Sequence, residues 1–148
     1  EEFGWRGVLE HHLIERMDFW RGVAALGFVW GIWHVPVNLA GYNYSDAPVW
    51  GALVAFPVEL VAVSFIMAWL TIRARSFWPA VLMHGSGNGI EDGVVSSIQL
   101  VTGVAPLTAD YVQLAITICL AIACAAMTPR QAVSGQALLP ASRSLGDP

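Results

Sequence analysis

Four long segments of the chain contain almost no charged residues. The segments 22–45, 47–72, 76–104 and 111–129 hold only three charges, at Glu59, Glu91 and Asp92. Their apolar residues occur on all sides of a helix rather than along one stripe, and a helix of about 20 mainly apolar residues can cross a bilayer. The pattern therefore predicts an all-α fold with four membrane-spanning helices, at residues 19–40, 49–72, 77–101 and 107–127.

The arginines predict how these helices are oriented. All seven basic residues are Arg, and they fall near the start of the first helix, between the second and third, and after the fourth: Arg6, Arg16, Arg21, Arg73, Arg75, Arg130 and Arg143. Basic residues are enriched in cytoplasmic loops. We therefore expect these regions, the carboxy terminus included, to face the cytoplasm. Trp20, Trp50, Trp78 and Tyr111 lie near span ends, where aromatic side chains gather at the membrane surface.

Composition supports a membrane protein and narrows its partners. Apolar residues make up 56% and charged residues 12% of the chain, whereas soluble proteins average roughly 45–50% and about 25%. A net charge of −4 gives no indication of a nucleic-acid partner. Cys119 and Cys124 lie in one apolar segment, without the spacing of a disulfide framework or a metal site. The lack of Lys beside abundant Ala and Arg favours a bacterial source, and hence the inner (plasma) membrane.

We expect one domain at residues 1–128, followed by a disordered cytoplasmic tail at residues 129–148. The tail is rich in Ser, Ala, Gly and Pro, which is typical of disorder. The chain begins with Glu1 rather than Met, inside a polar motif. This start suggests that further helices of the same protein precede it.

Polar side chains at membrane depth are candidates for function, because an ionisable group there costs at least ~2.5–3.5 kcal/mol on insertion scales. The expected spans contain six polar candidates: His34, Glu59, His84, Asn88, Glu91 and Asp92. No chemical role follows from the sequence for Glu59, Glu91 or Asp92.

The third expected helix carries a polar face. His84, Asn88 and Asp92 follow one another at four-residue spacing, so they lie on one side of a helix. Glycines surround them, at Gly85, Gly87, Gly89 and Gly93, and small residues let another helix approach closely. This face is expected to meet a packed neighbour or a wet cavity. A polar seam that only holds helices together is the alternative.

His34 lies two residues before Pro36 in the first expected helix. One interpretation is structural, with the ring bonded to a carbonyl that the proline frees. The other is functional, because His84 occurs two spans later on a helix of the same direction.

Glu1 and Glu2 precede Arg6 in a chain with few charges. Glu2 and Arg6 are four residues apart, and Glu before Arg is the better order for an ion pair on a helix. This pairing leaves Glu1 as a free carboxylate that could act as a base.

Together, Glu1-Glu2-Phe3-Gly4-Trp5-Arg6, Trp30-x-x-x-His34 and His84-x-x-x-Asn88 resemble the CPBP intramembrane protease family. This family includes the type II CAAX prenyl endopeptidases and the Abi bacteriocin-immunity proteins, with the pattern EExxxR, FxxxH and HxxxN on successive membrane helices. Trp30 stands where the pattern has Phe, and we expect the same packing role. Members have about eight spans, so the amino-terminal half would be missing here.

The resemblance implies hydrolysis of a peptide bond near the carboxy terminus of a peptide or protein substrate that could be prenylated. Glu1 and His34 would activate water, His84 and Asn88 would hold the oxyanion, and the Glu2–Arg6 pair would brace the first helix. Burial is expected to raise the pKa of such a carboxylate toward a useful range.

Cofactor use stays open at this point. Glu1, His34 and His84 could form a three-ligand zinc site, as in a metalloprotease. However, no HExxH pair lies on one helix. A glutamate mechanism without metal needs no further ligand.

Two other functions remain as alternatives. One is a non-catalytic binding or bacteriocin-immunity protein that keeps the pocket. The other is a proton-coupled transporter, since intramembrane His, Glu and Asp also form proton relays.

Overall fold

The computed structural model describes residues 1–90 and 96–128, and these residues form helices and short connections with no strand. The all-α prediction is confirmed. Glu91, Asp92, Gly93, Arg130, Arg143 and the tail expected at 129–148 lie outside the described residues. The elements are α1 (Glu2–Gly4), η1 (Trp5–Leu9), α2 (Glu10–Met17), α3 (Phe19–Trp33), α4 (Val35–Leu39), α5 (Pro48–Trp50), η2 (Gly51–Ala55), α6 (Phe56–Ala74), α7 (Trp78–Ile90), α8 (Ser96–Thr102) and α9 (Pro106–Ala126).

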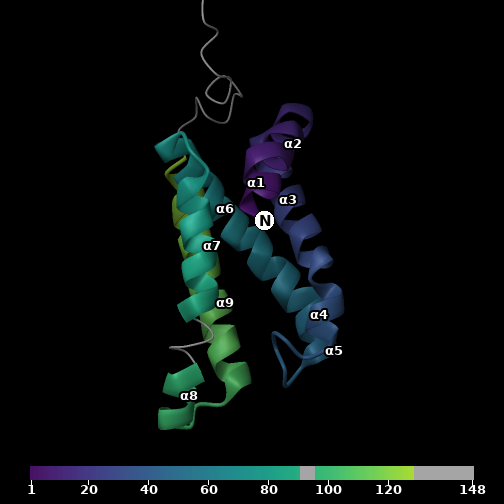
Figure 1. Ribbon diagram of the computed structural model, residues 1–148, viewed down its shortest axis with the longest axis vertical. Coiled ribbons are helices and arrows are strands. Elements are labelled where there is room, and N and C mark those ends of the chain that lie inside the picture. Colours follow the sequence, from purple (N-terminus) through teal and green to yellow (C-terminus); the bar gives the residue numbers. More distant parts are fainter. Residues whose placement is uncertain (91–95, 129–148) are drawn as a thin grey trace, which may run out of the picture.

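The helices pack around α6. The segment α1–η1–α2 is one helical stretch that leads to α3, and Asp18 caps the start of α3 by accepting a hydrogen bond from the Arg21 amide at 3.0 Å. α3 packs most extensively on α6, while α7 and α9 also contact α6 (Figure 1). The end of α2, the connection from α6 to α7 and the end of α9 lie at one end of the molecule in this view.

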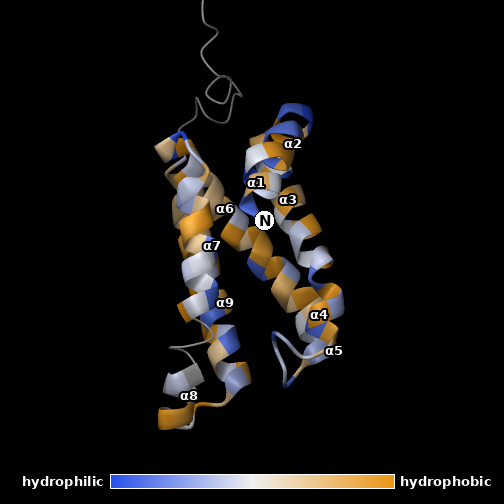
Figure 2. Cartoon of the chain, viewed as in Figure 1, coloured by the Kyte–Doolittle hydropathy of each residue, from blue (hydrophilic) through white to orange (hydrophobic). Residues whose placement is uncertain are grey.

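Among the described residues, two helical stretches are long and apolar enough to cross a membrane, Pro48–Ala74 and Pro106–Ala126. They correspond to the second and fourth expected spans. The first expected span is instead divided into α3 and α4, and the third is described as helical from Trp78 to Ile90. Figure 2 shows hydrophobic residues along α3, α6 and α7, with hydrophilic residues gathered in α2.

The division of the first expected span has a local cause. Pro36 has no amide hydrogen and disfavours the helical conformation of the residue before it. Near this point the His34 amide bonds to the Gly31 carbonyl at 3.1 Å, one residue closer than in an α-helix. The Trp30 carbonyl therefore loses its usual backbone donor.

Close helix packing depends on glycines of the first expected span. A Cβ on Gly27 would lie 2.5 Å from Val61 Cα, and one on Gly31 would lie 2.6 Å from Pro57 Cα. These two positions let α3 approach the backbone of α6.

The glycines of the third expected helix behave differently. A Cβ added to Gly85, Gly87 or Gly89 would meet no described atom within 4 Å. The expectation that they allow a close helix contact is therefore wrong within the described residues.

Candidate active site

The centre of the site is a buried arginine between two carboxylates. Arg6 Nε lies 3.3 Å from Glu2 Oε2 and 3.5 Å from Glu10 Oε2, and all three side chains are buried. The Arg6 Nη2 group donates a hydrogen bond to Ser64 Oγ of α6 at 3.1 Å. Its guanidinium also lies 4.7 Å from the centroid of the Trp30 ring. The ion pair expected from the Glu2 and Arg6 spacing is present. The contacts of Arg6 with Ser64 and Trp30 also connect this helical stretch to α6 and α3.

Glu2 connects this cluster to α7. The Nδ1 of His84 lies 2.9 Å from Glu2 Oε1, while the other oxygen of Glu2 faces Arg6. With Glu2 ionised, its oxygens can only accept, so Nδ1 of His84 carries the hydrogen. In the neutral ring Nε2 is then the acceptor nitrogen, and it becomes a donor only in the doubly protonated ring.

Glu1 is held by two indole groups. Its Oε2 accepts a hydrogen bond from Trp5 Nε1 at 3.3 Å and from Trp30 Nε1 at 3.1 Å. Desolvation raises the pKa of Glu1, but the two indole bonds and the nearby His84 and His34 outweigh it, and the pKa is lowered overall. The expected upward shift is therefore wrong for this carboxylate, because donors surround it.

His34 is oriented by the helix break. Its Nδ1 lies 2.9 Å from the Trp30 carbonyl, the group that lost its backbone donor. A carbonyl can only accept, so Nδ1 carries the hydrogen and Nε2 is left with the lone pair. One ring nitrogen of His34 is thus bonded to a carbonyl at the helix break, but this carbonyl belongs to Trp30 and not to Ile32, the residue four positions before Pro36. The second nitrogen stays suited to acid–base chemistry.

A hollow of about 550 Å³ opens between α1 and α7. Four of the predicted site residues line it: Glu1, Glu2, His84 and Asn88. Its remaining lining is mainly apolar and is formed by Phe3, Phe77, Trp78, Val81 and Gly85. The polar face of the third expected helix therefore borders a cavity over His84 and Asn88.

His34 is not part of this lining, but the Trp30 ring links it to the hollow. The ring centroid of Trp30 lies 6.0 Å from that of His34 and 5.1 Å from that of His84. One tryptophan thus contacts both histidines and bonds Glu1. All six predicted residues are consequently gathered around Trp30 or the hollow.

The donor set does not fit zinc. No three His, Cys, Asp or Glu side chains among residues 1–90 and 96–128 are grouped so that they could hold a metal ion. Oε2 of Glu1 is engaged by the indole groups of Trp5 and Trp30.

Sequence reasoning missed three groups at this site. Trp30 was expected only to pack, yet its N–H bonds Glu1, which Phe could not do. Glu10 and Ser64 were not considered, although both contact Arg6. The four-residue spacing from Arg6 to Glu10 could have indicated the first contact. Nothing in the sequence indicates Ser64.

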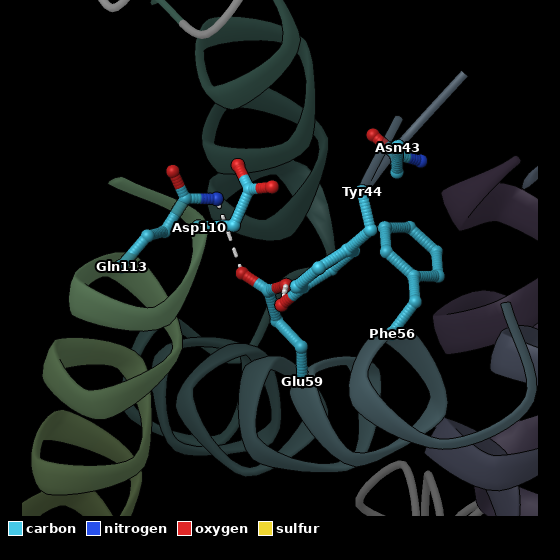
Figure 3. A pocket seen from close by; sticks show the side chains of 6 residues that line it. All are labelled: Asn43, Tyr44, Phe56, Glu59, Asp110 and Gln113. Atoms are coloured by element: carbon cyan, nitrogen blue, oxygen red, sulfur yellow. Dashed lines mark hydrogen bonds between the residues drawn. The ribbon is translucent and has the colours of Figure 1, made fainter. Parts of the chain in front are cut away.

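A second polar cluster surrounds Glu59 (Figure 3). Its carboxylate accepts hydrogen bonds from Tyr44 Oη and from Gln113 Nε2, both at 3.1 Å, and Asp110 lines the same small hollow. These bonds join α6 to α9 and to the connection between α4 and α5. Glu59, which had no assigned role, therefore ties three parts of the fold together.

The chain matches a known family of proteins. The family model described as type II CAAX prenyl endopeptidase Rce1-like matches residues 1–90. This range includes all six predicted site residues. No curated protein and no solved structure matches the chain.

Proposed function

The chain belongs to the Rce1-like family of type II CAAX prenyl endopeptidases, and on this premise we propose that it hydrolyses a peptide bond in the hollow between α1 and α7. Membership of this family supports the activity of a membrane protease of the CAAX type. The observation that carries the proposal is the meeting of Glu1, His84 and Asn88 in one hollow, with the Glu2–Arg6 pair behind them.

In the proposed reaction, Glu1 and His34 activate the attacking water. The indole bonds hold Glu1 ionised, so its carboxylate can accept a proton from water. His34 presents Nε2 as a second acceptor, because its Nδ1 is fixed by the Trp30 carbonyl. Activated water then attacks the scissile carbonyl, and the proton that it loses is passed to the leaving amine.

His84 and Asn88 are proposed to stabilise the oxyanion of the tetrahedral intermediate. They lie one helical turn apart on the hollow side of α7. Asn88 can donate through its amide group, whereas His84 can donate from Nε2 only in its doubly protonated form. Donors placed where negative charge develops contribute about 3–4 kcal/mol each to the rate. Glu2 and Arg6 orient His84.

The apolar wall of the hollow indicates what kind of substrate fits. Phe3, Phe77 and Trp78 form a series of ring contacts, at 6.3 Å and 5.5 Å between centroids. Such a wall suits an apolar group next to the cleaved bond. We therefore propose a peptide or protein substrate that carries a lipid group such as a prenyl chain near its carboxy terminus, cleaved by a protein of the bacterial plasma membrane.

The experiment is a cleavage assay of the full-length protein in detergent. Peptides with and without a prenyl group are incubated with wild type, with Glu1→Gln, and with Glu15→Gln as a control at an exposed carboxylate. We expect wild type and Glu15→Gln to cleave and Glu1→Gln to lose activity by about 10³-fold or more. A chelator arm tests the proposal that no metal is needed, and activity should survive it.

Other outcomes identify the alternatives. Peptide binding without cleavage by folded wild type would contradict the protease and support a binding or immunity protein. Proton-driven flux in liposomes would support a transporter. Loss of activity with chelator would overturn the metal-free mechanism while leaving the protease in place.

A further inference from the structure

Glu10 is a third buried carboxylate at the site, and the mechanism above does not use it. Its side chain is as buried as those of Glu2 and Arg6. It lies 3.5 Å from the same Arg6 nitrogen that Glu2 approaches at 3.3 Å. Two carboxylates therefore lie within ion-pair distance of one nitrogen of a single cation, and neither forms a hydrogen bond with it.

The π-helical turn η1 brings Glu10 onto this face. An α-helix advances about 40° beyond a full turn every four residues, so residues spaced by four gradually drift around it. A π-turn contains more residues and reverses that drift. η1 spans Trp5–Leu9, between Glu2 and Glu10. π-turns within α-helices are frequent at functional sites.

We propose that Glu10 is a positioning residue of the endopeptidase, which acts on His84 through Arg6 and Glu2. The inference rests on the proposed function. When Glu10 is ionised, Arg6 interacts with two carboxylates and neutralises each of them less. Glu2 then becomes a stronger acceptor for the Nδ1–H of His84. When Glu10 is protonated, Arg6 pairs with Glu2 alone, and the bond from His84 to Glu2 weakens.

The protonation of Glu10 changes near neutral pH. Burial raises its pKa, Arg6 lowers it and Glu2 raises it, which places the pKa at about 7. The other elements packed on this cluster contribute the neutral Ser64 of α6, the Trp30 ring of α3 and His84 of α7. Since Glu10 is protonated below pH 7 and ionised above it, the contact between Glu2 and His84 strengthens as pH rises through about 7.

A pH series of cleavage tests the proposal. We compare kcat/KM of wild type and Glu10→Gln at pH 6 and pH 8, with Ser64→Ala as a control that removes an uncharged contact of the same arginine. Wild type should exceed Glu10→Gln about tenfold at pH 8, the effect of about one pKa unit of interaction, and should nearly equal it at pH 6. The ratio of wild type to Ser64→Ala should be the same at both pH values.

A second readout does not need cleavage. The downfield proton resonance of His84 Nδ1–H, assigned by its loss in His84→Gln, reports its bond to Glu2. In wild type it should move further downfield from pH 6 to pH 8, and in Glu10→Gln it should not. If wild type cleaves no peptide, the proposed function fails and this resonance alone decides the role of Glu10.

The outcomes are separable. A wild type to Glu10→Gln ratio that is equal at pH 6 and pH 8, or a His84 resonance that responds alike in both proteins, would overturn the proposal and leave Glu10 with a purely structural role. Glu10→Gln is near-isosteric and removes a costly buried charge, so it is expected to fold. Should it not fold, Glu10→Asp replaces it and must retain the rise in activity from pH 6 to pH 8.

Discussion

At the scale of single residues, Trp30 shows how one side chain can serve several neighbours. It is 2% exposed, and its indole N–H bonds Glu1 while its ring contacts Arg6, His34 and His84. The family pattern has Phe at this position, which could make the ring contacts but not the hydrogen bond.

Trp30→Phe is therefore expected to change the pKa of Glu1 while an aromatic ring still fills the core. The lost indole bond is one of the causes that lower the pKa of Glu1, so this pKa should rise. A base with a raised pKa is protonated earlier on acidification, so the acid limb of the kcat/KM profile should move to higher pH. At acid pH the activity should fall about threefold to tenfold, the effect of losing one hydrogen bond to a charged group.

The measurement is the pH–rate profile of Trp30→Phe beside wild type. Trp20→Phe serves as the control, because Trp20 lies on the same helix α3 but is 43% exposed. An unchanged acid limb in a folded Trp30→Phe protein would contradict the assigned hydrogen bond.

At the scale of elements, the contact between α3 and α6 is set by backbone approach. Gly27 faces the backbone of Val61 and Leu60, and a Cβ there would lie 2.5 Å from Val61 Cα. Both partners are backbone atoms, so relief requires the two helices to separate. Overpacking of this kind costs about 1–3 kcal/mol.

Gly27→Ala is therefore expected to lower the free energy of unfolding by about that amount. Gly87→Ala is the matched control on α7, since no described atom lies within 4 Å of its added Cβ. It should be neutral or stabilising, because Ala is the better helix former. Thermal unfolding in detergent, followed by near-UV circular dichroism, compares the two. Equal losses in both variants would show that α3 and α6 are further apart than described.

The helix break at His34 could be predicted, but the glycine contacts could not. Pro36 acts through its own covalent structure, so its effect depends little on the rest of the fold. A glycine contact depends on which face of which helix is opposite. The sequence of the third expected helix therefore predicts either a packed neighbour or a cavity beside its glycines, whereas the structure places the close backbone contacts at Gly27 and Gly31 of the first.

At the scale of the whole molecule, the arginines predict a single orientation in the membrane. Figure 1 places the connection from α6 to α7 and the end of α2 at one end, and α4 and α5 at the other. Arg73 and Arg75 lie in the first region, and no basic residue lies between α4 and α5. The positive-inside tendency then predicts that the first end faces the cytoplasm.

Single cysteines test this orientation. Ser45→Cys and Ala74→Cys are exposed positions at opposite ends, made in a protein in which Cys119 and Cys124 are replaced by Ala. In intact cells, a membrane-impermeant maleimide should label Ser45→Cys and should label Ala74→Cys only after permeabilisation. The reverse labelling would invert the topology, and labelling of both in intact cells would contradict a membrane span between them.

The sequence alone determined the all-α class, the apolar segments, the family resemblance and the six candidate residues. These follow from covalent properties and from spacing along one helix, such as the four-residue interval that joins Glu2 to Arg6. The Glu2–His84 bond, the indole donors on Glu1, the second carboxylate on Arg6 and the zinc misfit were decided only by the tertiary structure. A hydrogen bond between residues 82 positions apart depends on how separate helices pack, and so do the pKa of Glu1 and the separation of possible metal ligands.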